Sequence, residues 1–329
     1  MEKSIKTNIS LMKEQKSYFF DYILSKNKNK KIMKYSPINR YLIFCNAEYG
    51  NLLIVINKII FYNKFFGYNN VVLDKKNTWF IKDKLFIKEY NITIDVDDIN
   101  KYIYNLHLLK PNNIFLYCFD FFYFPFKFKP EITINFLKNE ILKNIPKVNV
   151  SQDELYIHVR SGDIFNYFPL RYYAQPPLCF YEKVFENFNF KKKILITQKV
   201  RNNPIIRKLI KLYPEIISLN NSLRDDISYL MNAYNIIGSI SSFLMTNLIL
   251  NSNLKFLWDY NIYQFKEKIY HLHYDLYRFP NNNFTIYRME PSLYYKSKMF
   301  RWKNNKKQRY IMLKEKCRNN FQIIKRKDE

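Results

Sequence analysis

The chain has 329 residues, of which 48% are hydrophobic and 19% aromatic, a composition that excludes general disorder and can supply cores for two domains. The formal net charge is +26, which favours anionic ligands such as a sugar nucleotide. Lys and Asn are abundant and glycine is scarce, as in proteins from AT-rich coding sequences. This bias in composition therefore explains most of the positive charge. The alternative interpretation is a basic protein that binds nucleic acid.

The four cysteines stand singly, at positions 45, 118, 179 and 317, which excludes a CxxC zinc or thioredoxin motif. We expect free thiols in a reducing compartment. The first 16 residues lack the apolar core of a signal peptide, and charged residues and proline interrupt the most apolar window, 114–128. The sequence therefore predicts a cytoplasmic protein without an integral membrane segment, or a secretory-pathway protein if a targeting segment is missing.

The first half of the chain predicts a Lys- and Asn-rich arm, residues 1–40, followed by an α/β domain, residues 41–150. Apolar runs indicate strands. Apolar residues at helical spacing, with Gly67 as a C-cap, indicate a helix between the first two strands, which makes a βαβ unit. The predicted strands are 41–45, 71–73 and 114–117, and the predicted helices are 52–66 and 132–142.

The second half repeats the alternation of strands and helices over residues 151–290, and a basic helical tail follows at 291–329. Ser222 is a candidate N-cap for one of the helices. Repeated βα units of this length predict a doubly wound parallel sheet. The predicted strands are 155–157, 193–197, 216–219, 236–240 and 254–258, and the predicted helices are 180–188, 203–213, 225–232 and 242–250.

Three loops that follow predicted strands carry residues suited to a ligand site. They lie at 48–51, 158–163 and 238–243 and hold three of the four glycines of the chain. Ligands of open α/β sheets bind at the carboxyl ends of the strands. We therefore expect the three loops to line a cleft between two α/β domains.

The middle loop has the composition of a diphosphate site. Arg160 can present a planar fork of donors to phosphate oxygens. Gly162 allows backbone N–H groups to approach a ligand closely. Asp163 can orient the arginine or a sugar hydroxyl.

These motifs together resemble the superfamily of α1,2-, α1,6- and protein O-fucosyltransferases, which have the GT-B fold. Residues 158–163, His-Val-Arg-Ser-Gly-Asp, match the HxRRGD-type motif of the α1,2 enzymes (glycosyltransferase family 11), except that Ser161 replaces the second arginine. Residues 226–231 and 237–243 follow the family's C-terminal serine segment, although Leu244 and Met245 replace a tryptophan pair. Gly50-Asn-Leu-Leu53 is similar to the family's N-terminal glycine element. The resemblance covers roughly residues 41–260.

The resemblance implies an inverting, metal-independent glycosyltransferase that transfers fucose from GDP-fucose, its donor substrate, to a glycan hydroxyl without a cofactor. Arg160 would neutralise the β-phosphate and stabilise the leaving diphosphate. Glu48 would be the base for the acceptor hydroxyl, with Asp163 as the alternative. Gly50 and Asn51 would form the acceptor-side loop. The other donor-binding residues would be His158, Gly162, Asp226, Ser239, Ser241, Ser242 and Phe243.

Other patterns support competing hypotheses. Asp95 and Asp97 mimic the metal-binding DxD motif of GT-A glycosyltransferases, which are metal-dependent. His271 and His273 could be two metal ligands, but no third ligand stands at a telling spacing. The loss of the second arginine and the reduced glycine element are compatible with a degenerate, inactive transferase.

Overall fold

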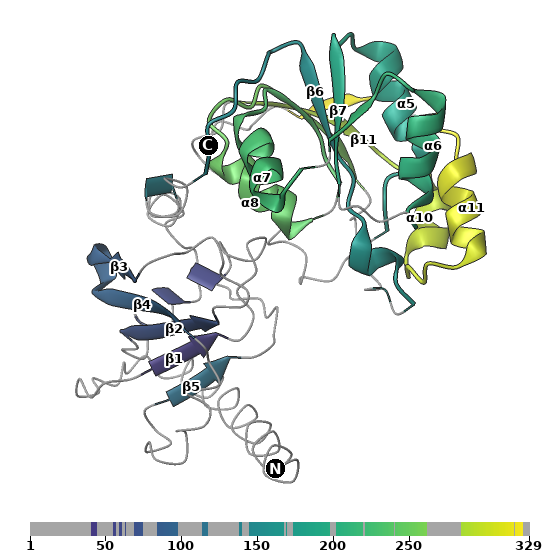
Figure 1. Cartoon of the computed structure of the whole chain (residues 1–329). Helices are drawn as coiled ribbons and strands as arrows, with labels where there is room; N and C mark the ends of the chain where they lie inside the picture. The colour runs from purple at the N-terminus through teal and green to yellow at the C-terminus, as the bar shows by residue number, and fades with distance from the viewer. Residues whose placement is uncertain are drawn as a thin grey trace. The chain divides into compact units, whose positions relative to one another are not determined.

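The structure is a computed structural model of the chain, and Figure 1 shows its elements. In the N-terminal part the described residues are 41–44, 55, 56, 59, 60, 63, 69–74, 84–97, 114–117, 138 and 139. Further along the chain they are 145–167, 169, 174–197, 202–219, 221–239, 241–261, 284–318 and 320–324.

The chain divides into two compact units. Unit 1 comprises Met1–Glu48 and Ile54–Phe121, and unit 2 comprises Tyr49–Leu53 and Phe122–Glu329. The division thus lies near residue 121, whereas the sequence suggested a boundary near residue 150. Residues 145–150 belong with unit 2, in which the Ser228 hydroxyl donates a hydrogen bond to the Pro146 carbonyl.

Within its described part, unit 1 contains a five-stranded sheet in the order β3-β4-β2-β1-β5. The strands β4, β2, β1 and β5 are parallel to their neighbours, and β3 runs antiparallel to β4. Val71, Val72 and Leu73 are all buried, as expected for a parallel strand covered on both faces. The strands are β1 (Tyr41–Phe44), β2 (Asn70–Asp74), β3 (Leu85–Ile87), β4 (Ile92–Asp97) and β5 (Ile114–Tyr117).

Within its described part, unit 2 contains a seven-stranded sheet in the order β12-β11-β10-β9-β6-β7-β8. All neighbouring strands are parallel except β11 and β12. Counted from β6, the six parallel strands follow the Rossmann order 3-2-1-4-5-6. The strands are β6 (Glu154–His158), β7 (Lys192–Ile196), β8 (Ile217–Ser218), β9 (Asn235–Ile237), β10 (Phe256–Tyr260), β11 (Thr285–Met289) and β12 (Gln322–Ile324).

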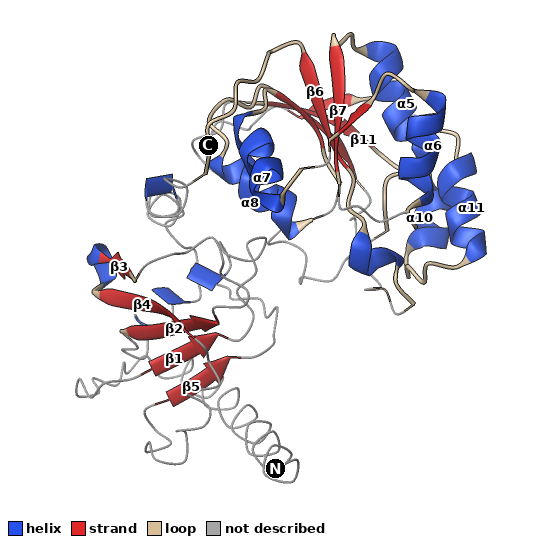
Figure 2. Cartoon of the chain, in the orientation of Figure 1, coloured by secondary structure: helices blue, strands red, loops and turns tan. Residues whose placement is uncertain are grey.

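Helices cover both faces of the unit 2 sheet. Helices α5, α6, α10 and α11 lie over one face, and α7 and α8 lie over the other (Figure 2). Local signals fix two of the helix starts: Asn203 caps α6 in front of Pro204, and Ser222 forms a capping box with Asp225 at the start of α7. The helices are α5 (Leu178–Asn187), α6 (Pro204–Leu212), α7 (Leu223–Asn232), α8 (Ser242–Leu250), α10 (Leu293–Met299) and α11 (Lys306–Lys314).

The predicted α/β fold class is confirmed. Each unit has a mainly parallel sheet of Rossmann type. Proteins of the GT-B class consist of two such units in one chain. The cleft that the sequence predicts between the domains stays a prediction. Among the described residues, no helix combines the length and the apolar character that crossing a bilayer requires.

The C-terminal segment differs from the separate basic tail that the sequence predicts. Tyr295, Trp302 and Met312 are fully buried in the unit 2 core, and β12 adds an antiparallel strand to the sheet. Trp302 Nε1 donates a hydrogen bond to the Ile164 carbonyl at 2.6 Å, 138 residues away in sequence. The segment combines a positive net charge with a buried face because a helix can bury one apolar stripe and expose its charges on the other side.

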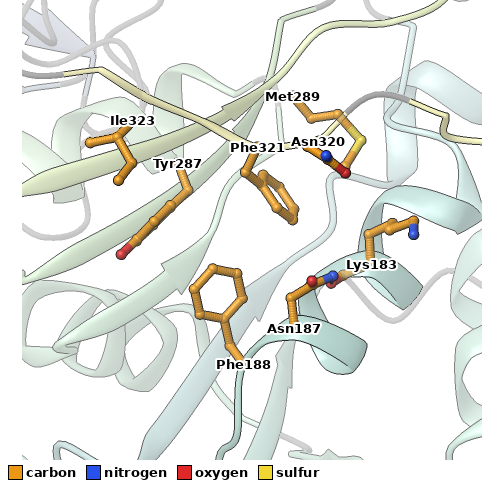
Figure 3. A pocket seen from close by; sticks show the side chains of 8 residues that line it. All are labelled: Lys183, Asn187, Phe188, Tyr287, Met289, Asn320, Phe321 and Ile323. Carbon is orange, nitrogen blue, oxygen red and sulfur yellow. The ribbon is translucent and has the colours of Figure 1, made fainter.

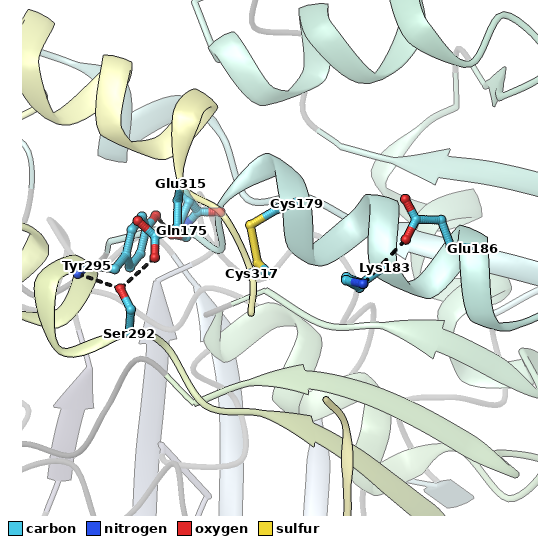
Figure 4. The surroundings of a disulfide bond; sticks show 8 residues. All are labelled: Gln175, Cys179, Lys183, Glu186, Ser292, Tyr295, Glu315 and Cys317. Carbon is cyan, nitrogen blue, oxygen red and sulfur yellow. Dashed lines mark hydrogen bonds and ion pairs between the residues drawn. A yellow bond between two sulfur atoms is a disulfide. The ribbon is translucent and has the colours of Figure 1, made fainter. Parts of the chain in front are cut away.

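Cys179 and Cys317 form a disulfide bond that joins α5 to the C-terminal segment (Figure 4). The expectation of free thiols is therefore wrong for this pair, whereas Cys45 and Cys118 lie outside the described residues. The two cysteines are 138 residues apart in sequence, with Cα atoms 5.6 Å apart. Their spacing gives no local signal, because partners so distant along the chain meet only through the tertiary fold.

Reduction of this disulfide should destabilise unit 2. The bond closes a long loop and restricts the unfolded chain, so its loss should cost about 2–5 kcal/mol. Thermal unfolding with and without a reductant measures the effect. The double variant Cys179→Ser/Cys317→Ser should unfold at the lower temperature of the reduced wild type and show no response to the reductant. An identical unfolding temperature for oxidised and reduced wild type would contradict the expectation.

Candidate functional site

The topological switch point of unit 2 lies between β6 and β9. These strands are neighbours in the sheet, and the helices that follow them, α5 and α8, lie on opposite faces (Figure 2). The connections after two such strands diverge and leave a crevice at the carboxyl edge, where ligands bind. The sequence predicts site residues in both connections. We call residues 159–163 the arginine loop and residues 238–241 the serine loop.

Hydrogen bonds from both neighbouring strands fix the backbone of the arginine loop. The Arg160 N–H donates to Ser239 Oγ of the serine loop at 2.9 Å. From the other side, Asn203 Nδ2 donates to the Arg160 carbonyl at 3.1 Å, and Thr197 Oγ1 donates to the Val159 carbonyl at 2.7 Å. The structure therefore brings together Arg160 and Ser239, which are 79 residues apart.

Sequence reasoning missed Thr197 and Asn203 as supports of the site. Asn203 precedes Pro204, a pattern typical of a helix start, so the sequence could have indicated an N-cap at the carboxyl edge of the sheet. Nothing local marks Thr197, whose role depends on the parallel pairing of β7 with β6.

Ser239 also contacts His158, the last residue of β6. Its Oγ lies 3.0 Å from His158 Nδ1. A serine hydroxyl that accepts the Arg160 N–H can still donate its own hydrogen, so the contact is compatible with a neutral His158 whose Nδ1 is the acceptor. Burial, with a contribution from the charge of Arg160, lowers the pKa of His158 to about 3. His158 therefore supports the loop and is not a proton donor near neutral pH.

Asp163 holds the Arg160 guanidinium. Arg160 Nη2 lies 2.7 Å from Asp163 Oδ2 and Nε lies 3.4 Å from Oδ1, and the arginine side chain is 16% exposed. Between them, Gly162 has a φ of 72°, which disfavours any residue with a Cβ. A guanidinium carries five N–H donors, so one held by a carboxylate can still orient others toward phosphate oxygens.

Ser161, where the fucosyltransferase motif has a second arginine, is turned inward. The residue is 1% exposed, and its Oγ has no hydrogen-bond partner among the residues that the structure describes. A buried polar atom without a partner is costly. The loop therefore places an unsatisfied hydroxyl, rather than a second cation, beside Arg160.

The serine loop leads into the N-terminus of α8. The Gly238 N–H donates to the Trp258 carbonyl at 2.8 Å, and a Cβ at this position would lie 3.3 Å from the Leu244 side chain, so the chain here is tightly packed. Ser241 is buried and is the N-cap of α8, without a side-chain capping bond. Ser242 begins the helix, but its side chain is not described. The Phe243 ring centroid lies 5.8 Å from that of His158.

Asp226 lies in the first turn of α7, which follows β8, and accepts a hydrogen bond from Asn221 Nδ2 at 3.3 Å. The remaining predicted site residues, Glu48, Gly50 and Asn51, follow β1 in the chain and lie outside the described residues. Their roles stay predictions.

The residues of the competing metal sites are described only in part. Asp95 forms an ion pair with Lys84 at 3.2 Å. No group of three His, Cys, Asp or Glu side chains suited to a metal ion occurs in the part of the chain that is described. His271 and His273 lie outside that part.

Comparison with known proteins identifies only distant structural relatives. No protein-family model matches the sequence, and no curated protein does. The fold is similar to that of E. coli heptosyltransferase WaaC with ADP, with 10% identity, 76% of this chain and 93% of that chain covered, and a TM-score of 0.39. For WaaC with ADP-2-deoxy-2-fluoro heptose the identity is 9%, the coverage 69% and 91%, and the TM-score 0.35. Similarity at this level is too weak to indicate an activity.

The neutral state of His158 should make stability depend on pH. The folded state disfavours protonation of this residue, while the unfolded chain takes up the proton near pH 6.5, so stability should fall as the pH drops from 6.5 toward about 3. The slope should reach about 1.4 kcal/mol per pH unit.

Urea unfolding at a series of pH values measures this slope. His158→Gln keeps a side chain that can form a hydrogen bond with Ser239 but cannot be protonated, so its slope should be lower than that of the wild type by about 1.4 kcal/mol per pH unit. The other three histidines of the chain stay in place and serve as the internal control. Equal slopes for the wild type and the variant would show that His158 is not buried in its neutral form.

Proposed function

We propose that the chain is an inverting glycosyltransferase of GT-B type that transfers fucose from GDP-fucose to a glycan hydroxyl. The observation that carries the proposal is the contact between the arginine and serine loops. Two motifs that are typical of the fucosyltransferases meet at the switch point of a Rossmann-type unit, through the Arg160 N–H and Ser239 Oγ.

The donor diphosphate would bind at the arginine loop. Arg160, oriented by Asp163, would contact the β-phosphate and stabilise the charge that develops on the leaving GDP. Gly162 would allow close approach of the phosphate. Since arginine supplies the positive charge, the reaction would require no metal ion.

The serine loop and α7 would hold the rest of the nucleotide. The N-terminus of α8 begins directly after the buried Ser241 and points its first N–H groups out of the helix, an arrangement that favours an anion. Ser241 and Ser242 would contribute hydroxyls to the ribose or phosphate, and Asp226 would accept from guanine or ribose.

The transfer step would be a single displacement. The acceptor oxygen attacks the anomeric carbon of fucose as the bond from this carbon to the β-phosphate oxygen breaks, and the bonding electrons leave with GDP. A carboxylate takes the proton of the acceptor hydroxyl. We assign this role to Glu48. Asp163, the alternative base, is paired with Arg160 at 2.7 Å and is better suited to hold the arginine.

A thermal-shift panel of GDP, ADP, UDP, CDP and GDP-fucose tests the donor assignment. GDP and GDP-fucose should raise the unfolding temperature by several degrees, since a ligand at 100 times its Kd adds about 2.7 kcal/mol. Arg160→Ala should weaken GDP binding about 10- to 100-fold through loss of charge-assisted hydrogen bonds. Arg318→Ala, an exposed arginine on the C-terminal segment, is the matched control. Stabilisation by another diphosphate alone, or by none, would overturn the GDP assignment.

Glu48→Gln should separate transfer from donor binding. The amide cannot accept the proton, so transfer to the glycan should fall by about 10²- to 10⁴-fold, while GDP-fucose still stabilises the variant. Product analysis by mass spectrometry together with the thermal-shift assay measures both. Turnover close to that of the wild type would exclude Glu48 as the base.

A further inference from the structure

A hollow of about 370 Å³ lies in unit 2 and shares no residue with the arginine or serine loop. Three parts of the chain form it: the C-terminal half of α5 with the residue that follows, the strand β11, and the C-terminal segment up to β12 (Figure 3). The lining residues are Lys183, Asn187, Phe188, Tyr287, Met289, Asn320, Phe321 and Ile323.

The hollow has an aromatic side and a polar side (Figure 3). Phe188 is the centre of the aromatic side, with its ring centroid 4.9 Å from that of Tyr287 and 5.9 Å from that of Phe321. Lys183 and Asn187, one turn apart on α5, stand on the polar side. The lining thus combines a surface for a flat ring with one cation and amide groups near it.

A disulfide bond links α5 to the C-terminal segment, two of the three parts of the chain that form the hollow. Cys179 is one turn before Lys183 on the same face of α5, and its partner Cys317 comes three residues before Asn320. The disulfide therefore anchors the C-terminal segment to the helix at one end of the hollow. A preformed site avoids much of the entropic cost of ordering its walls upon binding.

We propose that this hollow binds a small planar aromatic acid. The ring packs against Phe188, Tyr287 and Phe321, where edge-to-face contacts with other rings are favourable. The acid group accepts hydrogen bonds from the Lys183 ammonium, whose present ion pair with Glu186 is long, 3.6 Å, and lies at the surface. Such exposed pairs contribute little, so an acid can replace the glutamate.

The composition of the walls favours an aromatic acid over a sugar. On the aromatic side, Phe188, Phe321 and Ile323 offer no hydrogen-bond partners from their side chains, so hydroxyls of a sugar ring placed there would be desolvated against apolar atoms. The volume lies within the range of small-molecule sites. This site is independent of the proposed transferase reaction.

Titration of the full chain with 2-naphthoate, and with its uncharged amide as a second probe, tests the proposal. Wild type should bind 2-naphthoate saturably with a Kd of about 1 mM or tighter. Lys183→Met should weaken 2-naphthoate binding about tenfold and change binding of the amide less than twofold, since only the acid contacts the ammonium. Lys211→Met, an exposed lysine on α6, is the matched control and should change neither.

A second variant tests the part of the hollow that β12 forms, at a residue that lies outside the core. Ile323 is 55% exposed, so Ile323→Glu should fold normally and should repel the acid, which weakens its binding more than that of the amide. Absence of saturable binding to the wild type, or equal 2-naphthoate affinity of wild type and Lys183→Met, would overturn the proposal. Binding of methyl glucoside in competition with 2-naphthoate would also overturn it, because the hollow would then be a sugar site.

Discussion

One oxygen atom, Ser239 Oγ, joins the two loops of the candidate site. It accepts the Arg160 N–H and forms a hydrogen bond with His158 Nδ1, so it holds a backbone group of one loop and the side chain at the end of β6 together. Both bonds are largely shielded from water, where an unsatisfied partner costs about 1–3 kcal/mol. The same loop holds the Arg160 side chain through Asp163, and burial together with the charge of Arg160 keeps His158 neutral. His158, Arg160, Asp163 and Ser239 therefore form one connected hydrogen-bond network.

Sequence reasoning located this network where its signals were local. The run Leu155–Ile157 predicts a buried parallel strand, and polar residues that follow such a strand fall at the carboxyl edge of the sheet. The same argument applies to β9 and the serine loop. The cap Ser222 fixed the start of α7 within a few residues. The order of strands, which brings Arg160 beside Ser239, follows from the general preference for doubly wound sheets once the βα repeats are recognised.

The features that escaped the sequence depend on contacts between distant segments. Cys179 pairs with Cys317, and Trp302 donates to Ile164, in both cases across 138 residues. No spacing or composition signals such partners. The abundance of lysine in residues 291–329 concealed an apolar stripe that the core needs. Likewise, the sequence places His158 among the donor-binding residues but does not show its burial, which together with the charge of Arg160 lowers its pKa.

The bond from Trp302 to Ile164 has a consequence for the order of events during protein synthesis. Strand β6 and the arginine loop leave the ribosome well before Trp302. The Trp302 side chain donates a hydrogen bond to Ile164 in the short helix from Gly162 to Phe165. Until the last part of the chain emerges, Phe165 lacks the ring that packs against it at 5.6 Å. A nascent chain that already contains every motif residue therefore still lacks the packing of Trp302 next to the arginine loop, and unit 2 can complete its core only near the end of translation.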